Sequence, residues 1–178
     1  MIATARRFSF HVMQPAAIAE AWRRVCRGIE PTPAIAFGPE WAEERPRAGD
    51  GYALILDDHA IANGRACGDE AIGLLWVQKP CETTRVFGFG LFPEYRGYGV
   101  GPLVRDAIYT RVFENPAVRK LESCVYTSNP RSLATLHGER GRSLEEGRQR
   151  ATIQIDGIFY DRVLFGITRE EWERICAV

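Results

Sequence analysis

The stretch of sequence that decides the fold is Leu91-Phe92-Pro93-Glu94-Tyr95-Arg96-Gly97-Tyr98-Gly99-Val100-Gly101-Pro102. A predicted strand stops at Pro93, three alternate glycines follow, and Pro102 lies in the first turn of a predicted helix, where its missing N–H costs nothing. Glycines let successive backbone N–H groups point into one concavity, and a helix N-terminus adds unpaired donors. We therefore expect a phosphate-binding turn, although glycine spacing alone fits a plain strand-to-helix turn equally well.

Two familiar phosphate-binding loops are excluded by the same residues. The chain has no Gly-x-x-x-x-Gly-Lys-Ser/Thr sequence, and its glycines do not continue as Gly-x-Gly-x-x-Gly in a βαβ repeat. A nucleotide ligand is still compatible with the turn. A P-loop enzyme or a classical dehydrogenase is not.

The sequence on both sides of the turn predicts alternating strands and helices. We expect strands at 8–12, 52–56, 71–77, 85–92, 121–127, 151–155 and 158–165, and helices at 15–28, 102–113, from 129 and from 168. Asp156-Gly157 predicts a tight hairpin between the last two strands, and Thr168 with Glu171 predicts a capping box. Gly88 and Gly90 predict a bulge or a close approach of another backbone.

Two long connections interrupt this pattern. Residues 29–50 are rich in proline and have room for one short helix around Trp41. Residues 57–70 are too many for an ordinary hairpin loop, so we expect an insertion or a mobile flap.

Composition and charge limit the class of protein. The 178 residues are 46% hydrophobic and 26% charged, which predicts a single α+β domain over residues 1–178. Lys plus Arg and Asp plus Glu both number 23, so we expect no nucleic-acid and no membrane-surface binding. Five scattered cysteines, without a Cys-x-x-Cys pair or a zinc-spaced histidine, predict free thiols and no metal. With no apolar leader or bilayer-length stretch, a cytoplasmic location is expected.

The glycine turn resembles a known family motif. Arg96-Gly97-Tyr98-Gly99-Val100-Gly101 matches Gln/Arg-x-x-Gly-x-Gly/Ala, the signature of the GNAT superfamily of acetyl-CoA-dependent N-acetyltransferases. Residues 121–133 resemble the fifth strand and the Asn-x-x-Ser helix start of the branch that contains the ribosomal-protein N-terminal acetyltransferases. Further segments of residues 146–172 resemble the C-terminal hairpin and helix of that branch. The likeness covers residues 85–175, about half of the chain.

The resemblance implies both a fold and a cofactor site. It implies a central mixed, mostly antiparallel sheet flanked by helices, with the fourth strand splaying from the fifth at a bulge near Gly90. Acetyl-CoA would be the acetyl donor, its pantetheine arm on the exposed edge of the fourth strand and its pyrophosphate on the glycine turn. The cofactor-binding residues implied are Leu91, Phe92, Arg96, Gly97, Tyr98, Gly99, Val100, Gly101, Asn129 and Ser132.

The catalytic residues depart from the family pattern. Many members carry a tyrosine on the helix after Asn129 that protonates the leaving thiolate, but Leu136 and His137 occupy this place here. His137 is a candidate replacement, since imidazolium is a competent acid near neutral pH. Tyr126 and Glu122 share one face of the predicted fifth strand and are the other candidates. For each residue a surface or core role is the alternative.

These features together predict an N-acetyltransferase that moves an acetyl group from acetyl-CoA to a primary amine by direct attack on the thioester. The acceptor is a protein N-terminus or a small-molecule amine, and homodimer formation stays open. A noncatalytic acyl-CoA-binding or interaction module and an unrelated phosphate-ligand binder are the alternatives. We expect residues 31–46 and 57–70 to set acceptor choice, with acidic groups such as Asp57, Asp58 and Glu70 favouring a cationic amine.

Overall fold

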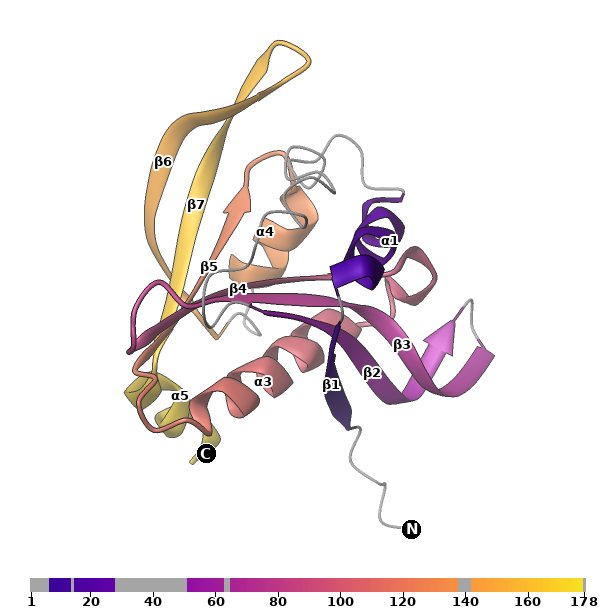
Figure 1. The fold of residues 1–178 in the computed structure, drawn as a ribbon. Coiled ribbons are helices and arrows are strands. Elements are labelled where there is room, and N and C mark those ends of the chain that lie inside the picture. The colour runs from indigo at the N-terminus through magenta and orange to yellow at the C-terminus, as the bar shows by residue number, and fades with distance from the viewer. Residues whose placement is uncertain (1–6, 14, 28–50, 63–64, 138–141, 178) are drawn as a thin grey trace.

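A seven-stranded sheet forms the centre of the molecule (Figure 1). The computed structural model describes residues 7–13, 15–27, 51–62, 65–137 and 142–177. The strands are β1 (Phe8–Val12), β2 (Gly51–Ala62), β3 (Arg65–Gln78), β4 (Thr84–Leu91), β5 (Lys120–Tyr126), β6 (Leu144–Ile155) and β7 (Ile158–Thr168). The helices are α1 (Pro15–Cys26), the short 3₁₀ turn η1 (Pro93–Tyr95), α3 (Val100–Phe113), α4 (Pro130–His137) and α5 (Arg169–Cys176).

The sheet is mixed and splayed, as the sequence predicts. Its strand order is β1-β2-β3-β4-β5-β7-β6, and β4 and β5 are the parallel pair. These two strands pair at three positions, from Thr84 opposite Lys120 to Val86 opposite Glu122, and then diverge. We call the unpaired segments, residues 87–91 of β4 and 123–126 of β5, the splay.

The splay begins earlier than expected. We expected the strands to part at a bulge near Gly90, but they part after Val86, and the register of β3 with β4 runs without a shift from Val86 to Leu91. The predicted bulge is therefore wrong.

The two glycines of β4 lie under bulky side chains. A Cβ atom on Gly88 would overlap the Trp76 ring, and one on Gly90 would overlap Val25 of α1. On this face the close approach is made by side chains of β3 and α1. The predicted approach of another backbone is also present, because a Cβ atom on Gly73 of β3 would overlap the Gly90 carbonyl.

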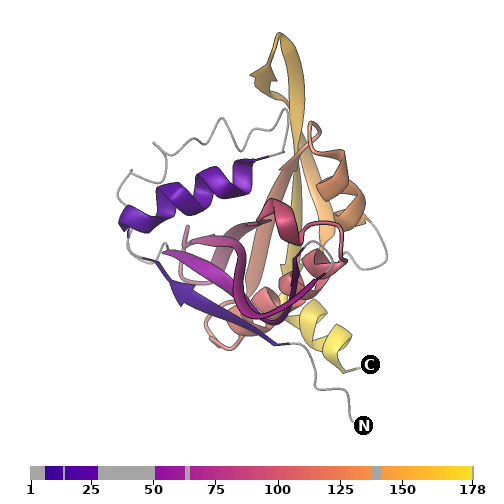
Figure 2. The same cartoon turned by 90° about the vertical axis from the view of Figure 1, so that its right-hand side faces the viewer.

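Helices cover both faces of the sheet. Gly88 and Gly90 face α1, whereas Phe87 faces α3, where its ring packs edge-on against Tyr109 at 5.6 Å. Trp172 of α5 packs on the same tyrosine at 5.4 Å, and α4 buries Leu136 with two β7 residues of that face, Val163 and Phe165. Figure 2 shows α1 on one side of the sheet and α4 on the other.

The expected flap is wrong, because residues 57–62 and 65–70 continue the two strands as one long hairpin. Register shifts between Ile55 and Ile61 break the alternation of apolar and polar side chains, which hides the strand pattern. Asn63-Gly64 lies between the strands in the sequence, and this dipeptide is a strong hairpin signal that indicates the arrangement.

The C-terminal predictions are confirmed. Asp156 and Gly157 have φ values of 49° and 80°, as a tight hairpin turn requires. Thr168 and Glu171 form both bonds of the capping box at the start of α5. The predicted connection 29–50 and its short helix lie outside the described residues. Among the helices that are described, none is long and apolar enough to cross a membrane.

Candidate functional site

The splay exposes main-chain groups of β4. The Phe92 N–H donates to the Ile72 carbonyl of β3 at 2.8 Å. Because successive residues of a strand direct their amide groups to opposite sides, the Leu91 N–H points away from β3 and into the splay. Phe89 has the same orientation by the same alternation. The last residues of β4 therefore offer backbone donors and acceptors at the edge where β5 has moved away.

The glycine turn adds a second set of donors. Gly97 and Gly99 have φ values of 88° and 70°, the left-handed region that glycine tolerates best. Gly99 is the N-cap of α3, so the N–H groups of Gly99, Val100 and Gly101 have no partner within the helix. Pro102 contributes no N–H. Three amides and the positive end of the helix dipole thus form an arrangement that suits an anion, and binding of the pyrophosphate there stays a prediction.

Arg96 clamps this turn to the end of α1. Its Nε donates to the Leu91 carbonyl at 2.9 Å, Nη1 donates to the Arg27 carbonyl at 2.9 Å, and Nη2 donates to the Val25 carbonyl. Burial lowers the pKa of Arg96, with a smaller contribution from Arg131. The sequence motif does not reveal this role, because two of the three carbonyls come from residues about seventy positions away. Whether Arg96 also contacts the cofactor stays a prediction.

A second contact joins the same two elements. Arg24 of α1 forms an ion pair with Glu94, and its guanidinium lies 4.0 Å from the centre of the Phe92 ring. Burial acts to raise the pKa of Glu94, but the hydrogen bond from Arg24 and the positive charges nearby lower it overall. Glu94 is therefore a structural residue, as its place before the turn predicts.

Asn129 and Ser132 lie where β5 passes into α4. The Asn129 side-chain oxygen accepts the Ser132 N–H at 3.1 Å, which caps the helix, and the Asn129 N–H donates to the Tyr126 carbonyl at 2.9 Å. Asn129 thus fixes the end of β5 at the open end of the splay. A cofactor contact from either residue stays a prediction.

The three catalytic candidates do not come together. His137 ends α4, with Nε2 2.7 Å from a Glu145 carboxylate oxygen and its ring 5.3 Å from the Phe165 ring. Tyr126 and Glu122 alternate with residues of the face that α3 and α4 cover, so they lie on the opposite face, the one that α1 covers. The sequence reasoning missed Glu145, because only the fold brings the start of β6 beside the end of α4.

Tyr126 and Glu122 differ in their surroundings. Tyr126 is half-buried at the last position of β5, opposite Arg162, and burial together with Cys124 raises its pKa more than Arg162 lowers it. Glu122 lies 3.0 Å from the Lys120 amine, which also binds Glu146 at 2.8 Å. Tyr126 therefore borders the splay as a neutral acid at neutral pH, whereas Glu122 is held in a surface ion-pair network.

The acidic residues expected at the acceptor mouth make contacts within the fold. Asp57 is fully buried in β2, and the Asp58 carboxylate accepts the Arg7 N–H at 2.8 Å. Glu70 accepts a hydrogen bond from the Tyr95 hydroxyl. The expected attraction of a cationic amine by these three groups therefore has no geometric support.

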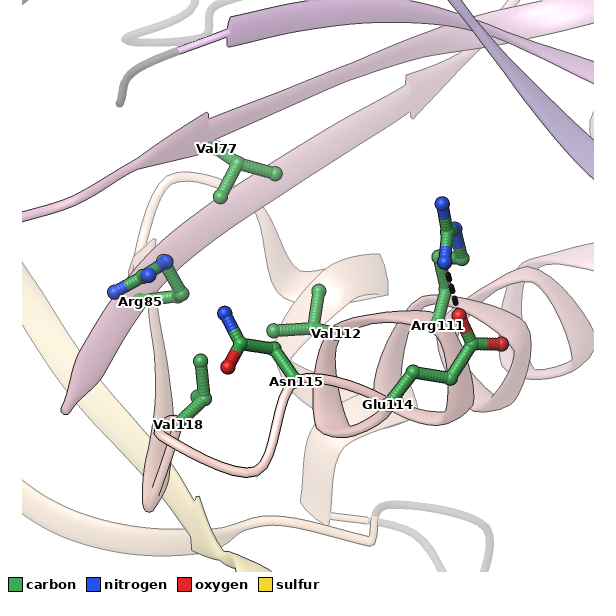
Figure 3. Close-up of a pocket in the computed structure, with 7 residues that line it drawn as sticks. All are labelled: Val77, Arg85, Arg111, Val112, Glu114, Asn115 and Val118. Atoms are coloured by element: carbon green, nitrogen blue, oxygen red, sulfur yellow. Dashed lines mark hydrogen bonds and ion pairs between the residues drawn. The ribbon is translucent and has the colours of Figure 1, made fainter. Parts of the chain in front are cut away.

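A cavity of about 550 Å³ lies at the other end of β4 (Figure 3). It is lined by Val77, Arg85, Arg111, Val112, Glu114, Asn115 and Val118. Arg85 pairs with Leu121 in the segment where β4 and β5 still hold together, and none of the predicted site residues lines this cavity. Arg111 and Glu114 form an ion pair on one side. Among the described residues, no group of three His, Cys, Asp or Glu side chains could hold a metal.

Comparisons with known proteins agree with the fold. No family model matches the chain. The "SPbeta prophage-derived uncharacterized N-acetyltransferase YokL" of Bacillus subtilis is 36% identical over 89 residues, 49% of this chain and 49% of that protein. The "Putative ribosomal N-acetyltransferase YdaF" of the same organism is 28% identical over 138 residues, 76% of this chain and 68% of that protein. The match thus spans about half of the first relative's length.

Among solved structures, the chain is similar to a chimera of the spermidine N-acetyltransferase SpeG from Vibrio cholerae and hSSAT. The TM-score is 0.69 at 13% identity, over 94% of this chain and 98% of that one. At this identity the likeness shows the fold alone. The chain therefore has the fold that the resemblance to the GNAT superfamily implies, and its sequence is similar to proteins named N-acetyltransferases.

Proposed function

We propose that the chain transfers an acetyl group from acetyl-CoA to a primary amine by direct attack on the thioester. One observation carries the proposal: the open edge of β4 leads directly into the glycine turn. The edge exposes the Leu91 amide, and the turn exposes three amides at the N-terminus of α3. The relatives named as N-acetyltransferases support the same activity.

The main chain supplies binding and polarisation in this proposal. The amides of Gly99, Val100 and Gly101 hold the pyrophosphate, and the open edge of β4 hydrogen-bonds the pantetheine arm. The Leu91 N–H donates to the thioester carbonyl oxygen, which stabilises the negative charge that develops there during attack. No charged side chain is needed for either step.

Side chains move the protons. The amine must be neutral to attack, its nitrogen forms a bond to the acetyl carbon, and the carbon–sulfur bond breaks to leave a thiolate. The attacking nitrogen gives up one proton to water to become the amide, and the thiolate gains one proton from an acid. We propose Tyr126 as the acid that donates a proton to the thiolate, because it borders the splay and stays protonated at neutral pH. His137 is the second candidate, with Glu145 orienting its imidazole, and Glu122 is the third.

The acceptor is a primary amine of two candidate classes. The name of one relative points to a ribosomal protein, and the name of the structural neighbour points to spermidine. We place the reaction in the cytoplasm, which the five scattered cysteines, without a Cys-x-x-Cys pair in the sequence, support.

A thiol-release assay with acetyl-CoA tests the proposal. The panel contains spermidine, a lysine-containing peptide and a peptide with a free N-terminus, and calorimetry measures acetyl-CoA binding separately. Turnover with one class supports the enzyme and names its acceptor. Binding without turnover on any amine favours the noncatalytic module, and no binding excludes both.

A further inference from the structure

A cluster of five polar side chains, three buried and two partly exposed, lies between α3 and the residues just before β6, apart from the splay. Three members are on α3, namely Arg105, Asp106 and Tyr109, and the other two are Arg142 and Ser143. Arg105, Tyr109 and Ser143 are more than nine-tenths buried. In Figure 1 this place is where the base of the β6–β7 hairpin meets α3.

Each member has a buried polar atom without a hydrogen-bond partner in the described part of the chain. These atoms are Arg105 Nη1, Asp106 Oδ1, Tyr109 Oη, Arg142 Nε and Ser143 Oγ. The Ser143 hydroxyl lies close enough to lower the pKa of Tyr109, which burial raises, but the two oxygens do not have hydrogen-bond geometry. Buried polar atoms in proteins nearly always have a partner, so five in one place require an explanation.

The chemistry of the five atoms identifies what is missing. Two are guanidinium donors, two are hydroxyls that can donate, and one is an acceptor. Two guanidinium groups face one carboxylate, and the single ion pair, Arg142 with Asp106 at 3.4 Å, is long. The cluster therefore has an excess of donors. Arg142 pairs with Asp106 and is partly exposed, so the uncompensated buried charge is that of Arg105, for which the described residues supply no ion pair. The missing partner is a hydrogen-bond acceptor that carries one negative charge.

Burial makes the missing charge important. Burial lowers the pKa of Arg105 and raises that of Asp106, which are the directions that disfavour both charged forms. The Tyr109 ring between Phe87 and Trp172 closes one side with apolar surface. An uncompensated buried charge costs several kcal/mol in such surroundings. Water molecules could satisfy the donors, but they could not balance the charge.

We propose that this cluster binds one small monovalent anion of halide size, held mainly by Arg105 with the hydroxyls of Tyr109 and Ser143. The ion joins the middle of α3 to the residues just before β6. It contributes to stability and takes no part in acetyl transfer, so the inference is independent of the proposed function.

Thermal unfolding of the whole chain tests the proposal. The midpoint Tm is measured at pH 7 in sodium chloride, sodium bromide and sodium gluconate at matched ionic strength. Linkage predicts that Tm rises by about 3 °C or more between 1 and 100 mM halide, and that gluconate has no such effect. Equal Tm values in all three salts would overturn the proposal.

Matched variants on the same helix locate the effect. Arg105→Met should remove the halide dependence of Tm, whereas Arg111→Met, at an exposed arginine one and a half turns further on, should keep it in full. If Arg105→Met does not fold, Tyr109→Phe and Ser143→Ala each remove one donor and should reduce the dependence. If Tm depended on halide as strongly as in the wild type in every variant that folds, the proposed site would be wrong. A bromide-soaked crystal should give an anomalous peak beside Arg105.

Discussion

The candidate site has two halves, the glycine turn and the region of β5 and α4, and they use different kinds of functional group. At the glycine turn the functional groups are backbone amides, placed by Gly97, Gly99 and the start of α3. On β5 and α4 they are side chains, and the three candidates there lie on two faces of the sheet. Main-chain sites depend on local conformation, which glycine and proline encode directly. Side-chain sites depend on which surfaces pack together.

The sharpest test of the side-chain half compares Tyr126→Phe with His137→Ala. If Tyr126 protonates the thiolate, Tyr126→Phe should lower kcat about 100-fold with little change in KM for acetyl-CoA. The acid must be protonated, so wild-type kcat should fall only as pH rises through the raised pKa of Tyr126, and the variant should lose that alkaline limb. A 100-fold loss of kcat in His137→Ala, with normal kcat in Tyr126→Phe, would show that His137 of α4 is the acid instead.

The main-chain half is tested by Gly99→Val. Gly99 adopts a left-handed conformation, so a β-branched side chain should distort the N-terminus of α3 and weaken acetyl-CoA binding about 10- to 30-fold. Gly147→Ala is the control, because Gly147 lies in β6 outside the turn and its Cβ would meet nothing within 4 Å. Calorimetric titration measures both affinities. Equal affinities of the two variants for acetyl-CoA would show that the conformation of the turn does not contribute to binding.

The features that could be predicted from the sequence are mostly those set by local conformation, and the features that could not are those set by packing. The turn, the Asp156-Gly157 hairpin and the Thr168 cap were predictable, because each depends on residues close together in the chain. The splay lies between strands that are far apart in the sequence, so only the family resemblance implied it, and it begins after Val86 instead of near Gly90. The β2–β3 hairpin was misread, since bulges interrupt its alternation. The Glu145 partner of His137 could not be predicted, because it depends on the packing of α4 against β7.

Arg96 belongs to the main-chain half, where it clamps the glycine turn to the end of α1, and its replacement has a smaller effect. Arg96→Lys keeps the charge but cannot reach three carbonyls in the same fork geometry, so it should cost about 1 kcal/mol of unfolding free energy. Chemical denaturation measures the loss. Arg23→Lys is the control, because that exposed arginine pairs only with Glu20 among the described residues. An equal loss in both variants would rule out the clamp.

The smallest effect is expected at Glu145→Gln. The pair with His137 is partly exposed, so its loss should change the unfolding free energy by less than about 0.5 kcal/mol. If Tyr126 is the acid, kcat should also be unchanged. A lowered kcat with unchanged stability would instead show that Glu145 orients a catalytic His137.

The short seam between β4 and β5 has a consequence for how the molecule opens. Three residue pairs join the four-stranded part of the sheet, β1 to β4, to the three-stranded part, β5 to β7. The helix α3 connects β4 with β5 and packs across both parts. Such a seam is a natural boundary between cooperative units, and amide hydrogen exchange should be faster along it than within either half. Partial opening there would let a long substrate arm pass between the strands while both halves stay folded.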